Sequence, residues 1–84
     1  MLVSKNIFSE IRSINGRIYV SLNNDVFLLD ETGYEIWKII TDDIDLKDLI
    51  LEVSKIYNVD YDFISEDIKG FISSLSELNL VEIK

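Results

Sequence analysis

The chain has 84 residues, 48% of them hydrophobic, and it contains neither cysteine nor histidine. This length suits one small domain with its own core, so residues 1–84 are interpreted as a single domain. Without cysteine there are no disulfides and no thiolate chemistry, and without histidine the commonest general base and metal ligand is missing. These features predict a protein that is not an enzyme and that holds no metal or other cofactor.

The net charge of −8 is unevenly distributed along the chain. Residues 1–29 contain three basic and two acidic residues, whereas residues 30–84 contain five basic and fourteen acidic ones. The acidic part repels the phosphates that dominate nucleic-acid binding, so no nucleic-acid partner is expected. The acidity either keeps the protein soluble or attracts a basic partner, and the sequence leaves both explanations open.

Membrane and secretion signals are not apparent in the sequence. No stretch of about 18 apolar residues is present, and the N-terminus lacks a charged segment followed by an apolar block. We therefore expect no membrane partner. Together with the absence of cysteine, this favours a cytoplasmic protein.

The first third of the chain predicts three short antiparallel strands. The segment Ile7–Ile14 alternates imperfectly, and Asn15-Gly16 is the favoured pair for a two-residue type I′ turn. A second strand is expected over Arg17–Leu22. After the turn Asn23-Asn24-Asp25, a third strand, Val26–Leu29, is apolar on both faces. Such a strand should be covered on both sides, by the protein or by a partner.

From there the apolar residues recur with the period of a helix. Thr32 and Glu35 match a capping box at the start of a helix over about Gly33–Thr41. Asp45 is expected to cap a second helix over Leu46–Tyr57. Five residues at helical spacing form one apolar stripe on it: Leu46, Leu49, Ile50, Val53 and Tyr57. Both helices are therefore predicted to bury one face.

A third helix is expected after the break at Asn58-Val59-Asp60, with Asp60 as its N-cap. Its predicted buried face consists of Ile64, Ile68, Phe71, Ile72, Leu75 and Leu78. Asn79 should end this helix because asparagine tolerates the left-handed conformation, and residues 80–83 should fold back as an extended tail. The predicted fold class is α+β, a three-stranded antiparallel β-meander followed by three helices.

Two acidic clusters, residues 42–48 and 60–67, superficially suggest calcium loops. Neither has the spacing of oxygen ligands around a central glycine that such a loop needs, so helix capping explains them better. The three glycines also form no phosphate-binding loop.

One flank of the third helix is formed by Phe63, Asp67, Gly70 and Ser74, which follow helical spacing beside the buried stripe. Small residues after an aromatic one predict a shallow groove. Gly70 costs about 1 kcal/mol relative to alanine inside a helix, which points to close packing there. The groove is explained either by packing against the protein's own sheet or by binding of an extended peptide beside the third strand.

The sequence resembles the PqqD-like proteins in the order of its predicted strands and helices and in four of its segments. The segments are Leu29–Trp37, Tyr57–Asp60, Asp67–Leu75 and Leu78–Val81. These proteins are peptide-recognition elements in the pathways of ribosomally synthesised and post-translationally modified peptides (RiPPs). The chain departs from the family pattern in having Thr41-Asp42-Asp43 where an Asp-Gly pair is common, and Asn79-Leu80 where Gly-Leu is common.

The resemblance implies a winged-helix-like domain that binds the leader of a precursor peptide as an extra strand on the third strand, against the third helix. The residues it assigns to the peptide site are Val26, Phe27, Leu28, Leu29, Phe63, Asp67, Ile68, Gly70, Phe71 and Ser74. The implied partners are the precursor peptide and a processing enzyme, such as a leader protease or a radical enzyme. The form Thr-Gly-x-x-Ile-Trp at residues 32–37 is similar to the stand-alone lasso-peptide type.

Two other interpretations remain open. The first is a winged-helix DNA-binding regulator, although its recognition helix would carry Glu66, Asp67 and Glu77 against the single cation Lys69. The second is an interaction domain without peptide cargo, a monomer or a weak homodimer joined through the third strand.

Overall fold

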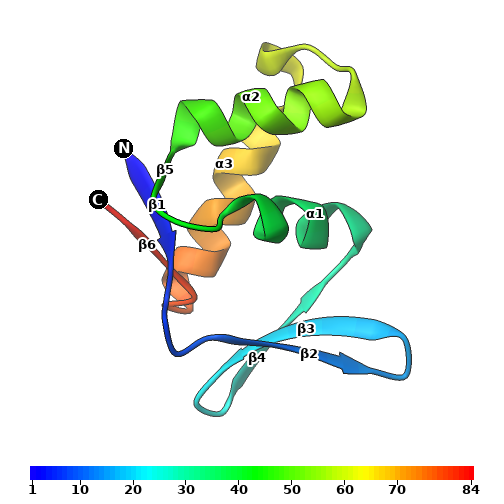
Figure 1. Cartoon of the computed structure of the whole chain (residues 1–84), viewed down its shortest axis with the longest axis vertical. Coiled ribbons are helices and arrows are strands. Elements are labelled where there is room, and N and C mark those ends of the chain that lie inside the picture. The colour runs from blue at the N-terminus through cyan, green and yellow to red at the C-terminus, as the bar shows by residue number, and fades with distance from the viewer.

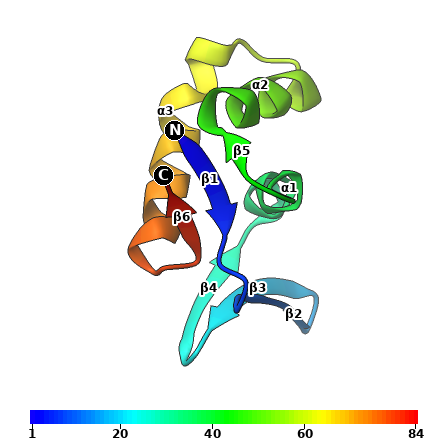
Figure 2. The same cartoon turned by 60° about the vertical axis from the view of Figure 1, so that its left-hand side comes forward.

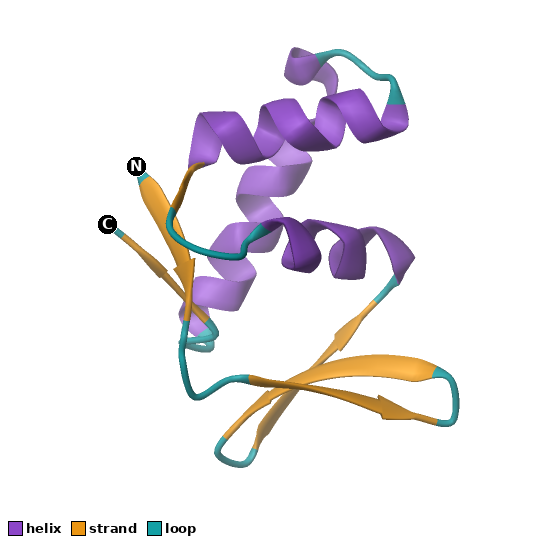
Figure 3. Cartoon of the chain, viewed as in Figure 1, coloured by secondary structure: helices purple, strands orange, loops and turns teal.

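A computed structural model describes all 84 residues and confirms the α+β class. Its elements are β1 (Leu2–Lys5), β2 (Glu10–Ile14), β3 (Arg17–Leu22), β4 (Asp25–Leu29), α1 (Glu31–Ile39), β5 (Ile44–Asp45), α2 (Leu46–Tyr57), α3 (Tyr61–Glu77) and β6 (Val81–Ile83). The three helices pack together above a meander of β2, β3 and β4, and the two chain ends lie next to each other (Figure 1). The strands thus fall into two separate sheets, the meander and a small β5-β1-β6 sheet (Figure 3).

The meander follows the predicted order β2-β3-β4, with antiparallel pairing throughout. Asn15 and Gly16 both have positive φ, 52° and 78°, as a type I′ turn requires, so the predicted hairpin is confirmed. The register places Ile11, Val20 and Phe27 beside one another on one face. Only β3 is paired on both sides, and β2 and β4 are therefore free edges.

The prediction for the N-terminal residues was wrong in two respects. The first strand of the meander begins at Glu10 instead of Ile7, because the preceding residues form a turn in which the Ser9 amide donates to the Asn6 carbonyl at 3.0 Å. Ile7 and Phe8 lie in this turn and are largely exposed. Strand β1 was also not predicted, and its partners β5 and β6 come from distant parts of the chain.

The start of α1 also differs from the prediction. The N-cap is Asp30, whose carboxylate accepts a hydrogen bond from the Gly33 amide at 2.7 Å, whereas Thr32 is already helical. Strand β4 ends at Leu29, so Asp30 is the first residue free to adopt the extended cap conformation. Aspartate is among the best N-cap residues, and it displaces the expected capping box. The helix ends at Ile39, before the predicted Thr41.

The other two helices begin and end close to the predicted positions. Asp45 caps α2 by accepting from the Lys47 amide at 2.9 Å, as predicted. Asp60 occupies the N-cap position of α3, but its side chain makes no capping bond. Asn79 has φ 60°, which confirms the left-handed residue after α3, and the predicted tail forms β6.

The core contains fifteen buried hydrophobic residues drawn from both sheets and all three helices. Its members are Val3, Val20, Leu22, Leu29, Ile36, Trp37, Ile40, Leu49, Ile50, Val53, Ile68, Ile72, Leu75, Leu80 and Val81. Ile64, Phe71 and Leu78, predicted to be buried, are only partly buried. They recur at seven-residue spacing and form one edge of the apolar face of α3. No helix is both long and apolar enough to cross a lipid bilayer.

Candidate functional site

The free edge of β4 is the first component of the site. No strand pairs with β4 on the side away from β3, so backbone donors and acceptors are available there. Successive side chains of β4 point to opposite faces: Leu29 is buried and Phe27 partly buried, whereas Val26 and Leu28 are 61% and 51% exposed. The strand that is apolar on both faces is therefore covered on one face only.

Helix α3 reaches the meander through an aromatic contact. The rings of Phe27 and Phe71 meet edge to face, with centroids 6.3 Å apart. Phe71 also lies against Gly33 of α1, where a Cβ atom would be 3.3 Å from the ring. A hollow of about 320 Å³, here called the edge hollow, is lined by Phe27, Leu28, Asp30 and Phe71. An apolar depression thus adjoins the unpaired strand.

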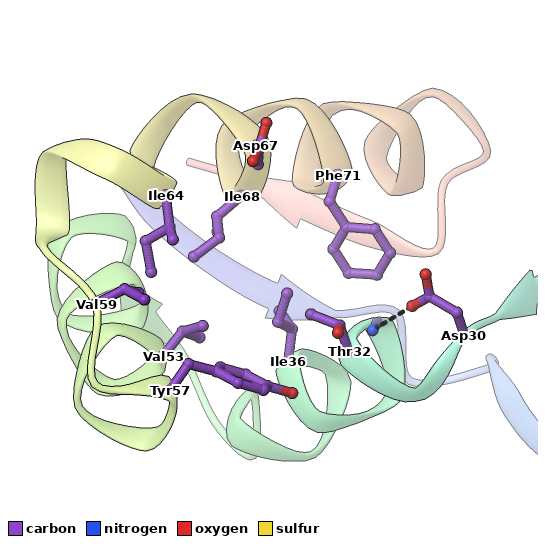
Figure 4. A pocket seen from close by; sticks show the side chains of 11 residues that line it. Asp30, Thr32, Ile36, Val53, Tyr57, Val59, Ile64, Asp67, Ile68 and Phe71 are labelled. Atoms are coloured by element: carbon purple, nitrogen blue, oxygen red, sulfur yellow. Dashed lines mark hydrogen bonds between the residues drawn. The ribbon is translucent and has the colours of Figure 1, made fainter.

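A second cavity, here called the helix pocket, lies among the three helices. Its lining consists of Asp30, Thr32, Gly33, Ile36, Val53, Tyr57, Val59, Ile64, Asp67, Ile68 and Phe71. The cavity measures about 300 Å³, and its floor is formed by aliphatic side chains from all three helices (Figure 4). Asp30 and Phe71 line both the helix pocket and the edge hollow, so the two cavities adjoin.

Charge at the two cavities is exclusively negative. Asp30 and Asp67 are the charged residues of the lining, and one Asp30 oxygen is held by the Gly33 amide (Figure 4). The single cation of α1, Lys38, is 2.7 Å from Glu35, and this hydrogen bond raises the pKa of Lys38. The single cation of α3, Lys69, is likewise occupied, 3.6 Å from Glu66. The carboxylates at the cavities therefore have no basic partner within the protein.

Six of the ten peptide-site residues expected from the sequence lie at or beneath these cavities. Phe27, Leu28 and Phe71 line the edge hollow, while Asp67 and Ile68 join Phe71 in the helix pocket. Leu29 lies in the core beneath the strand. The structure thus brings together residues from β4 and α3 that are about forty positions apart in sequence.

The other four expected residues line neither cavity. Val26, Phe63, Gly70 and Ser74 are exposed, and Ser74 donates a hydrogen bond to the Gly70 carbonyl within α3. No atom lies within 4 Å of a Cβ built on Gly70, so the interpretation that this glycine packs against the protein's own sheet is wrong. Phe63, Gly70 and Ser74 thus lie exposed on α3 beside the cavities, whereas Asp67 of the same flank lines the helix pocket.

Sequence reasoning missed the contribution of α1 and α2 to the site. Gly33 and Ile36 of α1, and Val53 and Tyr57 of α2, line the helix pocket. Tyr57 was assigned to the buried stripe of α2 but is 41% exposed at the pocket. A glycine in the first turn of α1 was the available signal, because a missing side chain there marks a close approach by another element.

The groups that line the two cavities are suited to binding. No three acidic side chains are arranged to hold a metal ion, and the only titratable groups of the two cavities are Asp30, Tyr57 and Asp67. An unpaired strand edge, two adjoining apolar cavities and two carboxylates suit an extended chain better than a small polar ligand.

Comparison with protein families assigns the chain. The family model described as "Coenzyme PQQ synthesis protein D (PqqD)" matches residues 14–81, which is most of the sequence. The chain therefore belongs to the PqqD family. A search of curated proteins found no significant match.

Comparison with solved structures supports the same fold. The solution structure of the PqqD truncation of Methylobacterium extorquens PqqCD has a TM-score of 0.79 to this chain and covers 98% of it, with 89% of that protein matched. The two sequences are 14% identical, so the likeness concerns the fold. That protein is described as a functional, stand-alone RiPP recognition element.

Proposed function

We propose that this protein is a non-catalytic adaptor that binds the leader of a ribosomally made precursor peptide and presents it to a processing enzyme in the cytoplasm. The leader adds to β4 as a further antiparallel or parallel strand and lies against α3. The free edge of β4 beside the edge hollow is the observation that carries this proposal. Membership of the PqqD family and the fold shared with a RiPP recognition element support it.

β-Strand geometry gives β4 and α3 different roles in binding the leader. Backbone groups of β4 bind the leader regardless of its sequence, and alternate leader side chains point toward α3. The edge hollow between Phe27 and Phe71 accepts one of these side chains. Asp67, Gly70 and Ser74 border the path of the peptide on α3. Specificity therefore comes from α3 and affinity from both elements.

The enzyme served and the class of product are finer parts of the proposal. The Thr-Gly-x-x-Ile-Trp form at residues 32–37 makes a lasso-peptide pathway with a leader protease the first to test. The adaptor itself is monomeric when loaded, because a homodimer through β4 would occupy the edge that the leader needs. The DNA-binding alternative receives no support from the comparisons, and the acidic lining of the site disfavours it further.

The proposal is tested by filling the groove from α3. A synthetic leader of the precursor encoded next to this gene, labelled with fluorescein, is titrated with the Ser74→Trp and Gly70→Leu variants. Both residues are exposed, so the fold should survive, and we expect affinity to fall on the order of a hundredfold. Ser73→Trp is the matched control, since it adds the same bulk about 100° away around the helix. Equal affinity of all three folded variants and the parent would overturn the site.

Strand addition has a separate signature in the peptide. Replacing single leader amides with esters removes one backbone donor at a time. An added strand turns alternate amides toward β4, so losses of about 0.5–1.5 kcal/mol should recur at every second position. Uniform losses along the leader, or none, would rule out strand addition.

A further inference from the structure

The helix pocket lies beyond the end of the strand edge to which the proposed function assigns the leader. Strand β4 ends at Leu29, and Asp30, the next residue, lines both the edge hollow and the helix pocket. Phe71 forms the other boundary between the two cavities. A peptide that follows β4 past Leu29 therefore passes from one cavity directly to the other.

The protein leaves the helix pocket open. Gly33 contributes no side chain, and its missing Cβ allows Phe71 to stand at the boundary without closing the cavity. Tyr57 of α2 lines the pocket with 41% of its surface exposed. The pocket has a volume of about 300 Å³ and is lined by Ile36, Val53 and Ile64. Displacement of water from it by an apolar group of a ligand makes the free energy of binding more favourable.

The charges around the pocket indicate which residue type lies next to the apolar side chain of a bound peptide. Asp67 stands on α3 at the pocket and makes no ion pair, and Asp30 uses one of its two oxygens for the Gly33 amide (Figure 4). No cation lines the pocket, and residues 30–84 as a whole carry nine more acidic than basic groups. A peptide with a lysine or arginine beside its apolar anchor supplies the missing positive charge.

We infer that the helix pocket is a second recognition subsite, which takes a large aliphatic or aromatic side chain carried next to a lysine or arginine. This inference rests on the proposed function, because the same peptide occupies the β4 edge. The subsite fixes the register of the bound peptide, since backbone pairing along β4 alone allows slippage. Asp67, with the free oxygen of Asp30, selects the basic residue.

The test begins without assuming a natural partner. A displayed library of random dodecapeptides is selected on the immobilised full-length protein. We expect enriched peptides to share a large apolar residue with a lysine or arginine within two positions of it. Enriched peptides are then synthesised with a fluorophore, and their affinities are measured by anisotropy against four variants.

Two variants probe the pocket and two are controls. Thr32→Trp fills the pocket from an exposed position of α1 and should abolish binding. Asp67→Lys should weaken binding roughly tenfold at low salt, and this difference should shrink at 1 M salt as screening increases. Glu77→Lys makes the same charge change ten residues further along α3, about 15 Å away, and should leave affinity within twofold. Ser74→Trp reports the β4 groove independently.

The outcomes separate the two proposals. If enriched peptides lack basic residues and bind Thr32→Trp and Asp67→Lys like the parent, but lose affinity for Ser74→Trp, the second subsite is overturned and the strand-addition site stands. If Asp67→Lys and Glu77→Lys weaken binding equally, the basic residue of the peptide responds to the overall negative charge of the domain and not to Asp67. The subsite is then likewise overturned. If no peptide is enriched on the parent protein, both proposals fall.

Discussion

The two sheets of this protein are each three-stranded and antiparallel, but they differ in the burial of their strands and in their position relative to the helices. In the β5-β1-β6 sheet, the middle strand β1 is paired on both sides and its residue Val3 is completely buried. The strands of the meander lie side by side in the order β2-β3-β4 (Figure 2). All five residues of β2 are exposed, and β4 leaves one edge unpaired. The small sheet joins both ends of the chain to the helical core, and the meander projects away from it. The meander supplies the proposed recognition edge, and its residues Val20, Leu22 and Leu29 also belong to the core.

Backbone hydrogen bonds beyond its strands stabilise the small sheet, although these strands are only two to four residues long. The Leu2 amide donates to the Lys84 carbonyl at 2.9 Å, and the Lys84 amide returns a bond to Leu2 at 2.8 Å. The Leu46 amide bonds the Met1 carbonyl, so the start of the chain is also fixed to α2. Burial of Val3 and Val81 supports this pairing from the core side. In the proposed function, the unpaired β4 edge of the meander is where the leader binds.

The strongest test of this contrast introduces a charge into each sheet. Val3→Asp places a carboxylate at a site with no exposure and no cationic partner, and we expect it to lower the free energy of unfolding by at least about 3 kcal/mol. Ile14→Asp, at a residue of β2 that is 55% exposed, should change it by no more than about 0.5 kcal/mol. Urea unfolding followed by circular dichroism measures both. Comparable losses in the two variants would refute the contrast between the buried middle strand of the small sheet and the exposed strand β2 of the meander.

The same contrast explains which parts of the fold could be predicted from the sequence. The meander and the helices depend on local signals, such as Asn15-Gly16 and the apolar stripe of α2, and these were found. Strand β1 was not found, because four residues carry little periodicity and their partners lie more than forty and more than seventy positions away. Ile7 and Phe8 were mistaken for strand residues because apolar character predicts burial, whereas the Asn6 turn exposes them.

The candidate site was predictable to the extent that it uses periodic residues. Asp67 follows from the flank of α3, Phe71 from its apolar face, and Phe27 from a strand that is apolar on both faces. The helix pocket could not be found in the same way, because it depends on the angles at which α1, α2 and α3 cross. Gly33 reveals its role only when the ring of Phe71 is placed beside it.

A smaller effect is expected at the junction between the meander and the helices, where the cap of α1 was assigned incorrectly. Asp30→Ala removes the carboxylate that accepts from the Gly33 amide, so the free energy of unfolding should fall by about 1 kcal/mol. Thr32→Ala alters the residue that sequence reasoning took as the cap and should change stability by less than half as much. Thermal and urea unfolding compare the two variants. A larger loss of stability for Thr32→Ala would show that Thr32, and not Asp30, caps α1.

The smallest effect distinguishes the crowded glycine on α1, Gly33, from the open one on α3, Gly70. Gly70→Ala adds a methyl group where no atom lies within 4 Å, so it should raise the free energy of unfolding by up to about 1 kcal/mol through helix propensity alone. Gly33→Ala adds the same group 3.1 Å from the capping oxygen of Asp30 and 3.3 Å from the Phe71 ring, and we expect it to gain less than Gly70→Ala.

Peptide binding then separates the two glycines further. Gly33→Ala must shift the Phe71 ring by a few tenths of an ångström at the boundary of the two cavities, so it should weaken leader affinity even where the fold remains intact. A single methyl group at Gly70 is much smaller than the leucine that tests the groove, and Gly70→Ala should leave affinity nearly unchanged. If Gly33→Ala instead stabilises the protein as much as Gly70→Ala and binds the leader equally well, Phe71 moves freely. The meander and the helices would then be less tightly coupled at this boundary than the ring contact between Phe27 and Phe71 indicates.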